Sequence, residues 1–131
     1  MNVAIAAVET SSIAQGMVVA DAMVKTADID VIESAMLSPG KYWVLIGGGV
    51  APVRAAFQRG VEVAADTLLD SLFIPQLHEQ VLPALRGTAR AGGAGAADDA
   101  LGVLETLTAS AAIRAADAAA KAAAILVRDL R

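Results

Sequence analysis

The sequence predicts an α+β fold: an antiparallel sheet, built from elements in the order β-α-β-β-α-β, with its helices on one face. Three observations lead to this prediction. Short apolar runs alternate with longer segments in which apolar residues recur every three or four positions. Only Pro39, Gly40 and Lys41 separate the second apolar run from the third, which is too short for a crossover between parallel strands. The length of 131 residues is enough for one domain with a buried core.

The first two elements are a strand and a capped helix. Residues 2–9, NVAIAAVE, form a short apolar run that predicts a buried strand. Thr10, Ser11 or Ser12 is expected to cap the helix that follows, because a side-chain oxygen can accept a hydrogen bond from a free N–H of the first turn. The apolar stripe of this helix is predicted to comprise Ile13, Met17, Ala20, Val24 and Ala27.

A hairpin follows. Residues 30–38 and 42–46 are the predicted strands, and the chain reverses through Pro39 and Gly40. Proline presets φ at the second position of a type II turn, and glycine accepts the positive φ of the third. The two strands are therefore expected to be antiparallel neighbours.

The remaining elements complete the plan. A second helix follows Gly47–Gly49, and residues 71–75 and 77–85 predict a fourth strand and a short helix. The core-facing residues of the second helix segment are predicted to be Val53, Phe57, Val61, Ala64 and Leu68; the outward-facing residues are Arg54, Gln58 and Glu62. This order is the split-βαβ, ferredoxin-like fold, which hosts many unrelated functions.

The three glycines raise the question of phosphate binding. A Walker loop requires Lys-Ser or Lys-Thr after its last glycine, and neither follows here. A dinucleotide fingerprint requires a third glycine where Pro52 stands. The simpler interpretation is a sharp turn from strand to helix, with Pro52 in the first helical turn. An anion bound at this helix N-terminus remains the alternative.

Composition excludes several functions. The absence of cysteine excludes disulfides, thiolate nucleophiles and sulfur-ligated metals, and a single histidine excludes multi-histidine metal sites. With a net charge of −4 and no cluster of Lys or Arg, we expect no nucleic-acid binding. No apolar run reaches the roughly 18–20 residues that span a bilayer, and the N-terminus lacks the basic region of a signal peptide, so we expect a cytoplasmic protein without a membrane partner.

No residue pattern predicts catalysis. Ser11 and Ser12 precede a helix without a histidine nearby in sequence, and Glu9 ends a strand beside Thr10. His78 lies at a helix start, where a surface or interface role is the simpler interpretation. Asp98 and Asp99 lie in a Gly/Ala-rich stretch. We therefore expect no enzyme, no cofactor and no metal.

An internal repeat is the strongest signal. The stretch ETSSIAQGMVVADAMVKTADIDVIES, which begins at Glu9, aligns without a gap with ETLTASAAIRAADAAAKAAAILVRDL, which begins at Glu105. The displacement is 96 positions. The identical pairs include Glu9/Glu105, Thr10/Thr106, Ala20/Ala116, Asp21/Asp117, Lys25/Lys121, Ile29/Ile125 and Val31/Val127.

The repeat predicts three parts: a domain over 1–85, a flexible linker over 86–100, and the start of a second domain over 101–131. We expect the second copy to end within its second strand, and half a domain cannot close its own sheet. Two explanations remain open. The chain is a partial record of a tandem protein, or its tail docks onto a neighbour.

The motifs resemble those of bacterial microcompartment shell proteins. The resemblance is carried by AIAAVETSSIAQGMVVADAMVKTADIDVIES, VLIGGGVAPVRAAFQRGVEVA and LFIPQLHEQVLPAL, in this order. It covers residues 3–85, and residues 101–131 resemble the start of a second such domain. In that family, tandem-domain chains form trimers that imitate a hexagonal ring, and single-domain chains form hexamers. Both tile into a shell around enzymes, with a pore on the ring axis.

The resemblance implies a pore at the hairpin. The family's hairpin loop lines the axial pore, which places Ser38, Pro39 and Gly40 at the constriction and Lys41 just behind it. The implied cargo is small polar metabolites. One tandem subgroup, in propanediol-utilisation compartments, carries a cysteine at the position of Ser38 and holds an iron–sulfur cluster there. Without cysteine, this chain cannot fill that role.

The resemblance also implies a ring edge. Lys25 matches the family's edge lysine, although its spacing from Asp21 also predicts an ordinary helix-surface ion pair. His78 matches the histidine of an Arg-Pro-His edge segment, but Gln76 and Leu77 precede it here, so the edge arginine is missing. The alternative function is a small-ligand-binding regulatory domain on the same ferredoxin-like fold, which would form small closed oligomers instead of tiles.

Overall fold

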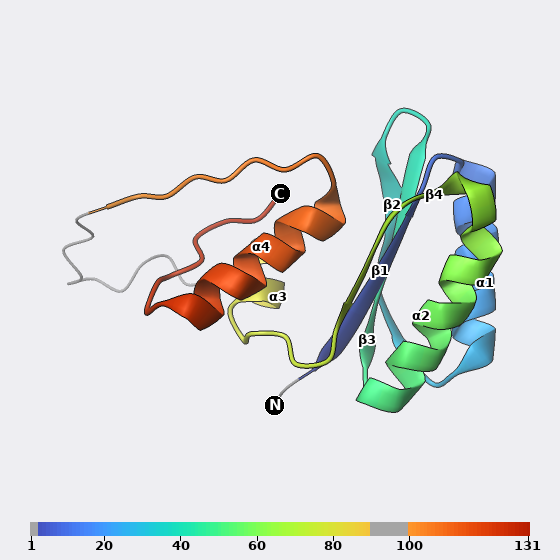
Figure 1. Ribbon diagram of the computed structural model, residues 1–131, viewed down its shortest axis with the longest axis horizontal. Coiled ribbons are helices and arrows are strands. Elements are labelled where there is room, and N and C mark those ends of the chain that lie inside the picture. Colours follow the sequence, from blue (N-terminus) through green and yellow to red (C-terminus); the bar gives the residue numbers. More distant parts are fainter. Residues whose placement is uncertain (1–2, 90–99) are drawn as a thin grey trace. The chain divides into compact units, whose positions relative to one another are not determined.

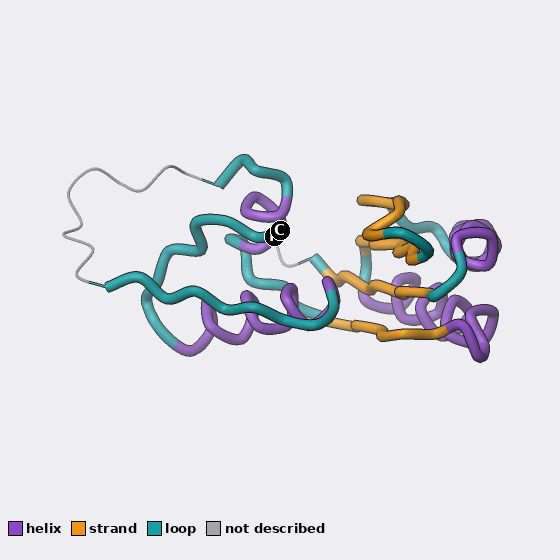
Figure 2. The backbone as a smooth tube through the Cα atoms, turned by 90° about the horizontal axis from the view of Figure 1, so that it is seen from above, coloured by secondary structure: helices purple, strands orange, loops and turns teal. Residues whose placement is uncertain are grey.

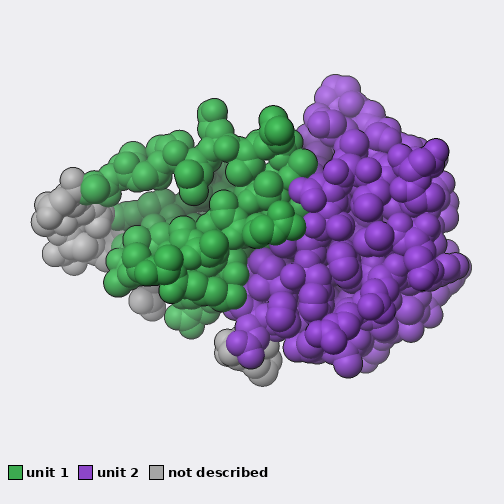
Figure 3. All heavy atoms as spheres, in the orientation of Figure 1, with its two compact units in different colours: residues 1, 78–131 green, residues 2–77 purple. Residues whose placement is uncertain are grey.

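The computed structural model describes residues 3–89 and 100–131, and the chain divides into two compact units (Figure 3). Residues 2–77 form the first, called here the sheet unit. The described residues from 78 onward, 78–89 and 100–131, form the second, called the C-terminal unit. The sequence placed the end of the first domain at residue 85, whereas the compact unit ends at Leu77.

The sheet unit contains the predicted elements in the predicted order (Figure 1): β1 (Ala4–Thr10), α1 (Ile13–Thr26), β2 (Asp30–Ser38), β3 (Lys41–Gly48), α2 (Val50–Ala64) and β4 (Leu68–Ile74). A 3-10 turn at Ala65–Thr67 joins α2 to β4. The strand order is β2-β3-β1-β4, and every neighbouring pair is antiparallel. Both helices lie on the same face of the sheet, as Figure 1 shows. The predicted α+β fold is confirmed.

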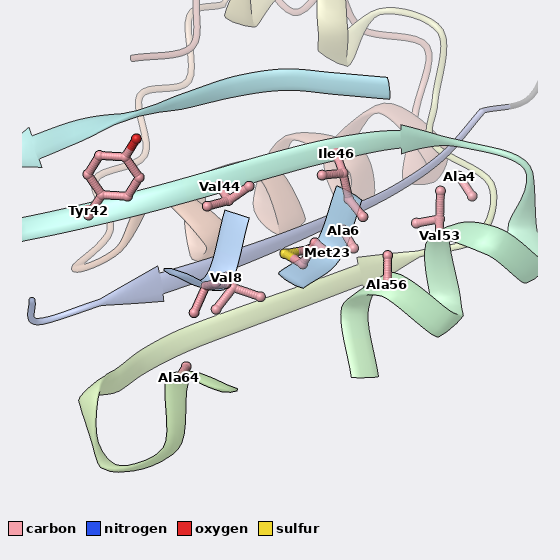
Figure 4. Packing of buried hydrophobic residues seen from close by; sticks show 11 residues of the cluster. Ala4, Ala6, Val8, Met23, Tyr42, Val44, Ile46, Val53, Ala56 and Ala64 are labelled. Carbon is pink, nitrogen blue, oxygen red and sulfur yellow. The ribbon is translucent and has the colours of Figure 1, made fainter. Parts of the chain in front are cut away.

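The core lies between the sheet and these two helices (Figure 4). Alternate residues of a strand point to one face of a sheet, and the strand contributions follow this period of two. The buried cluster comprises Ala4, Ala6 and Val8 of β1, Tyr42, Val44 and Ile46 of β3, Val19 and Met23 of α1, and Val53, Ala56 and Ala64 of α2.

The predicted apolar stripe of α1 is partly wrong. Gly16, Val19 and Met23 are the buried residues of this helix, whereas the side chains of Met17 and Val24 are 56% and 45% exposed. The cause is a close contact between α1 and the sheet that the prediction from apolar spacing did not take into account. A Cβ atom on Gly16 would lie only 2.5 Å from the Tyr42 ring, so the helix approaches the sheet through its glycine. This contact turns Met17 and Val24 outward.

Other local predictions are resolved in detail. Among the three candidate caps it is Ser12 that acts, because its Oγ accepts a hydrogen bond of 3.1 Å from the Gln15 N–H. Gly49 is the residue before α2, and Pro52 lies in the first turn of that helix as predicted. The third and fourth strands differ from their predicted bounds, since β3 begins one residue earlier and β4 begins three residues earlier.

The described residues of the C-terminal unit form two helices, α3 (Val81–Leu85) and α4 (Ala109–Ala122) (Figure 2). α3 packs against α4. The side chain of Gln80 holds the chain behind α4 through two backbone hydrogen bonds, one to the Ile125 carbonyl (3.0 Å) and one from the Val127 N–H (2.8 Å). Most of the predicted linker, residues 90–99, lies outside the described residues.

Within the described ranges, no helix is both long enough and apolar enough to cross a membrane.

We predict that Gly16→Ala destabilises the sheet unit. Alanine normally stabilises a helix relative to glycine by up to about 1 kcal/mol. Here the new methyl group would meet the Tyr42 ring, and overpacking costs about 1–3 kcal/mol. Urea unfolding followed by circular dichroism should therefore show a lower free energy of unfolding. Gly102→Ala is the control, since nothing lies within 4 Å of that position. A stabilised Gly16→Ala variant would contradict the assigned contact.

Candidate pore loop and edge residues

The hairpin tip is the first candidate site. β2 ends at Ser38 and β3 begins at Lys41, and these two residues pair across the turn. Gly40 has a φ of 81°, as the third residue of a type II turn requires. The sequence therefore predicted both the position of this turn and the reason for its glycine.

The hairpin tip exposes polar groups, and the strand residue just before it exposes an apolar side chain. Ser38, Pro39, Gly40 and Lys41 are all exposed. Together they offer one hydroxyl group, backbone groups and one ammonium group, without fixed negative charge. Just before them, the exposed side chain of Met36 (63%) was missed by the sequence analysis. Across the described residues, no cluster of His, Cys, Asp or Glu has the arrangement of a metal site.

Lys25 lies in the last turn of α1. Its Nζ forms an ion pair of 2.8 Å with Asp21 Oδ2, and the two side chains are 72% and 59% exposed. The ion pair predicted from the four-residue spacing is present. An exposed pair of this kind contributes little to stability, about 0.3–0.5 kcal/mol. Stability therefore does not explain its presence, and the residue remains available for contacts with other molecules.

His78 is fixed by α4, at the start of the C-terminal unit. Its backbone N–H donates a hydrogen bond of 2.8 Å to Asp117 Oδ1. Its ring nitrogen Nδ1 accepts a hydrogen bond of 3.2 Å from the Gln80 N–H. The sequence analysis did not assign a role to Asp117. The signal was available, because Asp117 is the repeat counterpart of Asp21.

The repeat is visible in the geometry of α4. The bounds of α4 are those of α1 displaced by 96 positions. The Thr108 side chain accepts from the Ala111 N–H as the Ser12 side chain accepts from the Gln15 N–H. A second hydrogen bond is repeated as well: Thr106 Oγ1 donates to the Thr108 carbonyl, as Thr10 Oγ1 donates to the Ser12 carbonyl. The ion pair between Lys121 and Asp117 repeats the one between Lys25 and Asp21.

The strands of the repeat are not formed. Residues 101–107 correspond to residues 5–11, which are nearly all of β1 and one residue behind it. They form no strand, however, and Leu101, Val103 and Leu104 are exposed. In the sheet unit, β1 pairs with β3 on one side and β4 on the other. Within the described residues, the repeated segment therefore shows the helix of the first copy but not its strand.

Comparison with known proteins identifies the family. The family model described as the BMC domain matches residues 4–77, which are almost the whole sheet unit. The chain belongs to this family, whose named relatives are shell proteins of bacterial microcompartments. The resemblance carried by the sequence motifs is confirmed, and these relatives agree with the expected non-enzymatic role.

Three relatives define the similarity more closely. The bacterial microcompartment shell protein PduT of Citrobacter freundii is 40% identical over 129 residues, which are 98% of this chain and 68% of PduT. The carboxysome shell protein CsoS1 of Prochlorococcus marinus is 31% identical over 88 residues, or 65% of this chain and 85% of CsoS1. A solved microcompartment protein from Desulfitobacterium hafniense DCB superposes with a TM-score of 0.73 at 36% identity, over 94% of this chain and 66% of that one. The chain thus spans about two thirds of PduT and of the solved protein.

Proposed function

We propose that this chain is a structural shell protein of a bacterial microcompartment, and that its domains assemble into ring-shaped tiles with a central pore. The observation that carries this proposal is the match of the sheet unit to the BMC domain, with an exposed polar hairpin tip on it. The tiles lie in the shell, inside the cytoplasm, and contact other shell proteins.

The ring contains either six domains from six chains or six domains from three tandem chains. The repeat supports the tandem form. The N-cap, helix and Asp-Lys ion pair of α1 recur in α4, and the similarity to PduT runs through both copies. The domain over 1–85, the linker over 86–100 and the start of a second domain over 101–131 remain part of this proposal.

The hairpin tips converge on the ring axis and line the pore. The tip residues are Ser38, Pro39, Gly40 and Lys41. Repeated around a ring, their hydroxyl and backbone groups form a polar collar, and Lys41 adds positive charge near its mouth. Polar groups desolvated by an apolar solute would lose their partners, so the pore favours small polar or anionic metabolites.

Lys25 and His78 lie at the perimeter, where neighbouring rings meet. The exposure of the Lys25 ammonium group supports this role. The C-terminal unit supplies a further argument. There Asp117 bonds both the His78 N–H and Lys121, the repeat counterpart of Lys25. A lysine of this type and His78 can therefore belong to one contact region at that perimeter.

A small-ligand-binding regulatory domain on the same fold is the alternative function. The family match and the three relatives named above favour the shell protein. The two functions also differ in assembly, since a regulator forms a small closed oligomer.

We predict rings in solution. Negative-stain electron microscopy of the purified protein at high concentration should reveal rings with a central depression, and the rings should associate edge to edge. A strictly monomeric protein, or closed dimers without rings, would contradict the proposed function.

We predict that Lys25→Ala leaves rings intact but weakens the association between them. The lost ion pair is exposed, so the domain itself should change by no more than about 0.5 kcal/mol in stability. Electron microscopy should then show single rings where the unmodified protein forms sheets. Arg59→Ala is the matched control, because it removes another exposed helix-surface ion pair, with Glu62 on α2. Loss of the rings themselves would refute the edge assignment.

We predict that Ser38→Asp slows an anionic solute more than a neutral solute of equal size. Each copy would add one negative charge to the collar, and the charges repel an anion within a Debye length of about 8 Å at physiological salt. Ser38→Asn is the matched control, because its side chain has the same shape without the charge. The measurement is solute entry into assembled shells. Equal slowing of both solutes would exclude the hairpin as the route.

A further inference from the structure

Three residues of α1 are buried in the core of the sheet unit, and none of them is kept in the repeat. They are Gly16, Val19 and Met23. A displacement of 96 positions leads to three alanines of α4, namely Ala112, Ala115 and Ala119. The N-cap, the bounds and the Asp-Lys ion pair do recur. The repeat therefore preserves what each helix needs to form, but not what α1 uses to pack on the sheet.

The first of these residues, Gly16, is fitted to Tyr42. A Cβ atom at Gly16 would lie 2.5 Å from Cδ1 of the Tyr42 ring and 2.7 Å from its Cβ. The ring cannot yield easily, because Tyr42 belongs to the buried cluster (Figure 4) and its hydroxyl shares a hydrogen bond of 2.7 Å with Ser34 Oγ. A helix with Ala112 at this position would therefore have to move away from the sheet.

The side chain of Met23 fills the space over Gly60 of α2. A Cβ atom at Gly60 would lie 2.7 Å from Met23 Sδ and 3.3 Å from Val8 Cγ2, so α1, α2 and β1 meet at this point. Ala119 in place of the methionine would leave most of this space empty, and an unfilled cavity in a core is destabilising. The outward shift that Ala112 requires would widen the cavity further.

The strand segment of the repeat carries the opposite change. Leu104 stands where β1 has Val8, so the larger side chain lies on the helix in the first copy and on the strand segment in the second. If α4 packed over β1, Ala119 would meet Val8 and leave a cavity. If α1 packed over residues 101–107, Met23 would meet Leu104 and the core would be overpacked. Mixed pairs are therefore unfavourable in both directions.

We propose that the helix-bearing face of the sheet selects its own helix, so that it accepts α1 and rejects α4. This surface fits a helix with glycine opposite the Tyr42 ring and a long, unbranched side chain over Gly60. The sequence of α4 meets neither condition. Gly16 and Met23 are thus the residues that determine which of the two similar helices packs here, both within one chain and between chains.

Exchange between the copies is otherwise favoured by the chain itself. Residues 101–107 form no strand, and their apolar side chains Leu101, Val103 and Leu104 are exposed, so the repeated segment is accessible for new pairing. Because both helices belong to one chain, each has an effective concentration on the order of millimolar for the other's place. Swapping of similar segments is a characteristic failure of repeat proteins. Different core residues prevent it without altering the caps that both helices need.

Hydrogen–deuterium exchange of the full chain, read by mass spectrometry, tests the inference. Gly16→Ala loosens α1 from the sheet. A second set of substitutions, the matched segment, gives the repeat the core residues of the first copy: Leu104→Val, Ala112→Gly, Ala115→Val and Ala119→Met. In the combined variant the amides of α1 should exchange at least about tenfold faster than in Gly16→Ala alone, because the matched α4 takes its place. The amides of α4 should exchange more slowly.

A control segment carries the same four changes of residue type at other positions: Leu107→Val, Ala111→Gly, Ala118→Val and Ala122→Met. The first-copy counterparts of these positions lie outside the buried cluster. Combined with Gly16→Ala, the control segment should therefore leave the exchange of α1 as it is in Gly16→Ala alone. Circular dichroism checks that the matched and control variants have the same helix content.

Thermal unfolding provides a second measurement on the same variants. Gly16→Ala should lower the Tm of the sheet unit, since the new methyl group meets the Tyr42 ring. The matched segment should restore part of this loss, because it supplies a helix with glycine at the critical position. The control segment should restore none of it.

Two results would overturn the inference. One is equal exchange of α1 in the matched and control variants, because the core residues would then not determine which helix packs on the sheet. The other is slower exchange of α4 in Gly16→Ala alone, because the sheet would then accept α4 with its own sequence. The inference goes beyond the proposed function, and neither result depends on whether rings form.

Discussion

The structure depends on one constraint: β1 must be paired on both sides. β3 pairs with it along one edge and β4 along the other, which makes β1 one of the two inner strands of the sheet, and its residues line the core. Burying an unpaired backbone N–H or carbonyl group costs free energy. A buried strand such as β1 is therefore stable only when both neighbouring strands pair with it. In the repeated segment the helix is formed, while residues 101–107 have no strand structure.

This difference separates local from non-local folding information. The helix α4 is specified by contacts within a few residues, such as the cap from Thr108 to Ala111 and the ion pair between Asp117 and Lys121. A strand takes its hydrogen bonds from distant parts of the chain, so its sequence alone is insufficient. The two copies therefore agree where the interactions are local and differ where they are not.

The same distinction explains how much the sequence could predict. The hairpin was predictable because Pro39 and Gly40 determine it, and β2 has the expected bounds. The sequence could not predict which face of α1 is buried. That face is determined by the packing of Gly16 on Tyr42, a contact between residues that are 26 positions apart. For the candidate site, the exposed tip and the Asp21–Lys25 pair followed from spacing alone. The bond from His78 to Asp117 required the fold of the C-terminal unit.

The repeated aspartate and lysine can contact different neighbours although they lie on one helix. In the C-terminal unit, the Asp117 side chain is turned inward to the His78 N–H and is 10% exposed, while the ammonium group of its partner Lys121 remains 46% exposed. A pair four residues apart can thus present its carboxylate to one neighbour and its ammonium group to another. At α1 both members of the pair are exposed, 72% at Lys25 and 59% at Asp21, so both groups can reach other molecules. Because an exposed ion pair adds little to the stability of its own helix, the recurrence of this pair in both copies is better explained by contacts that its two charged groups make with neighbouring segments.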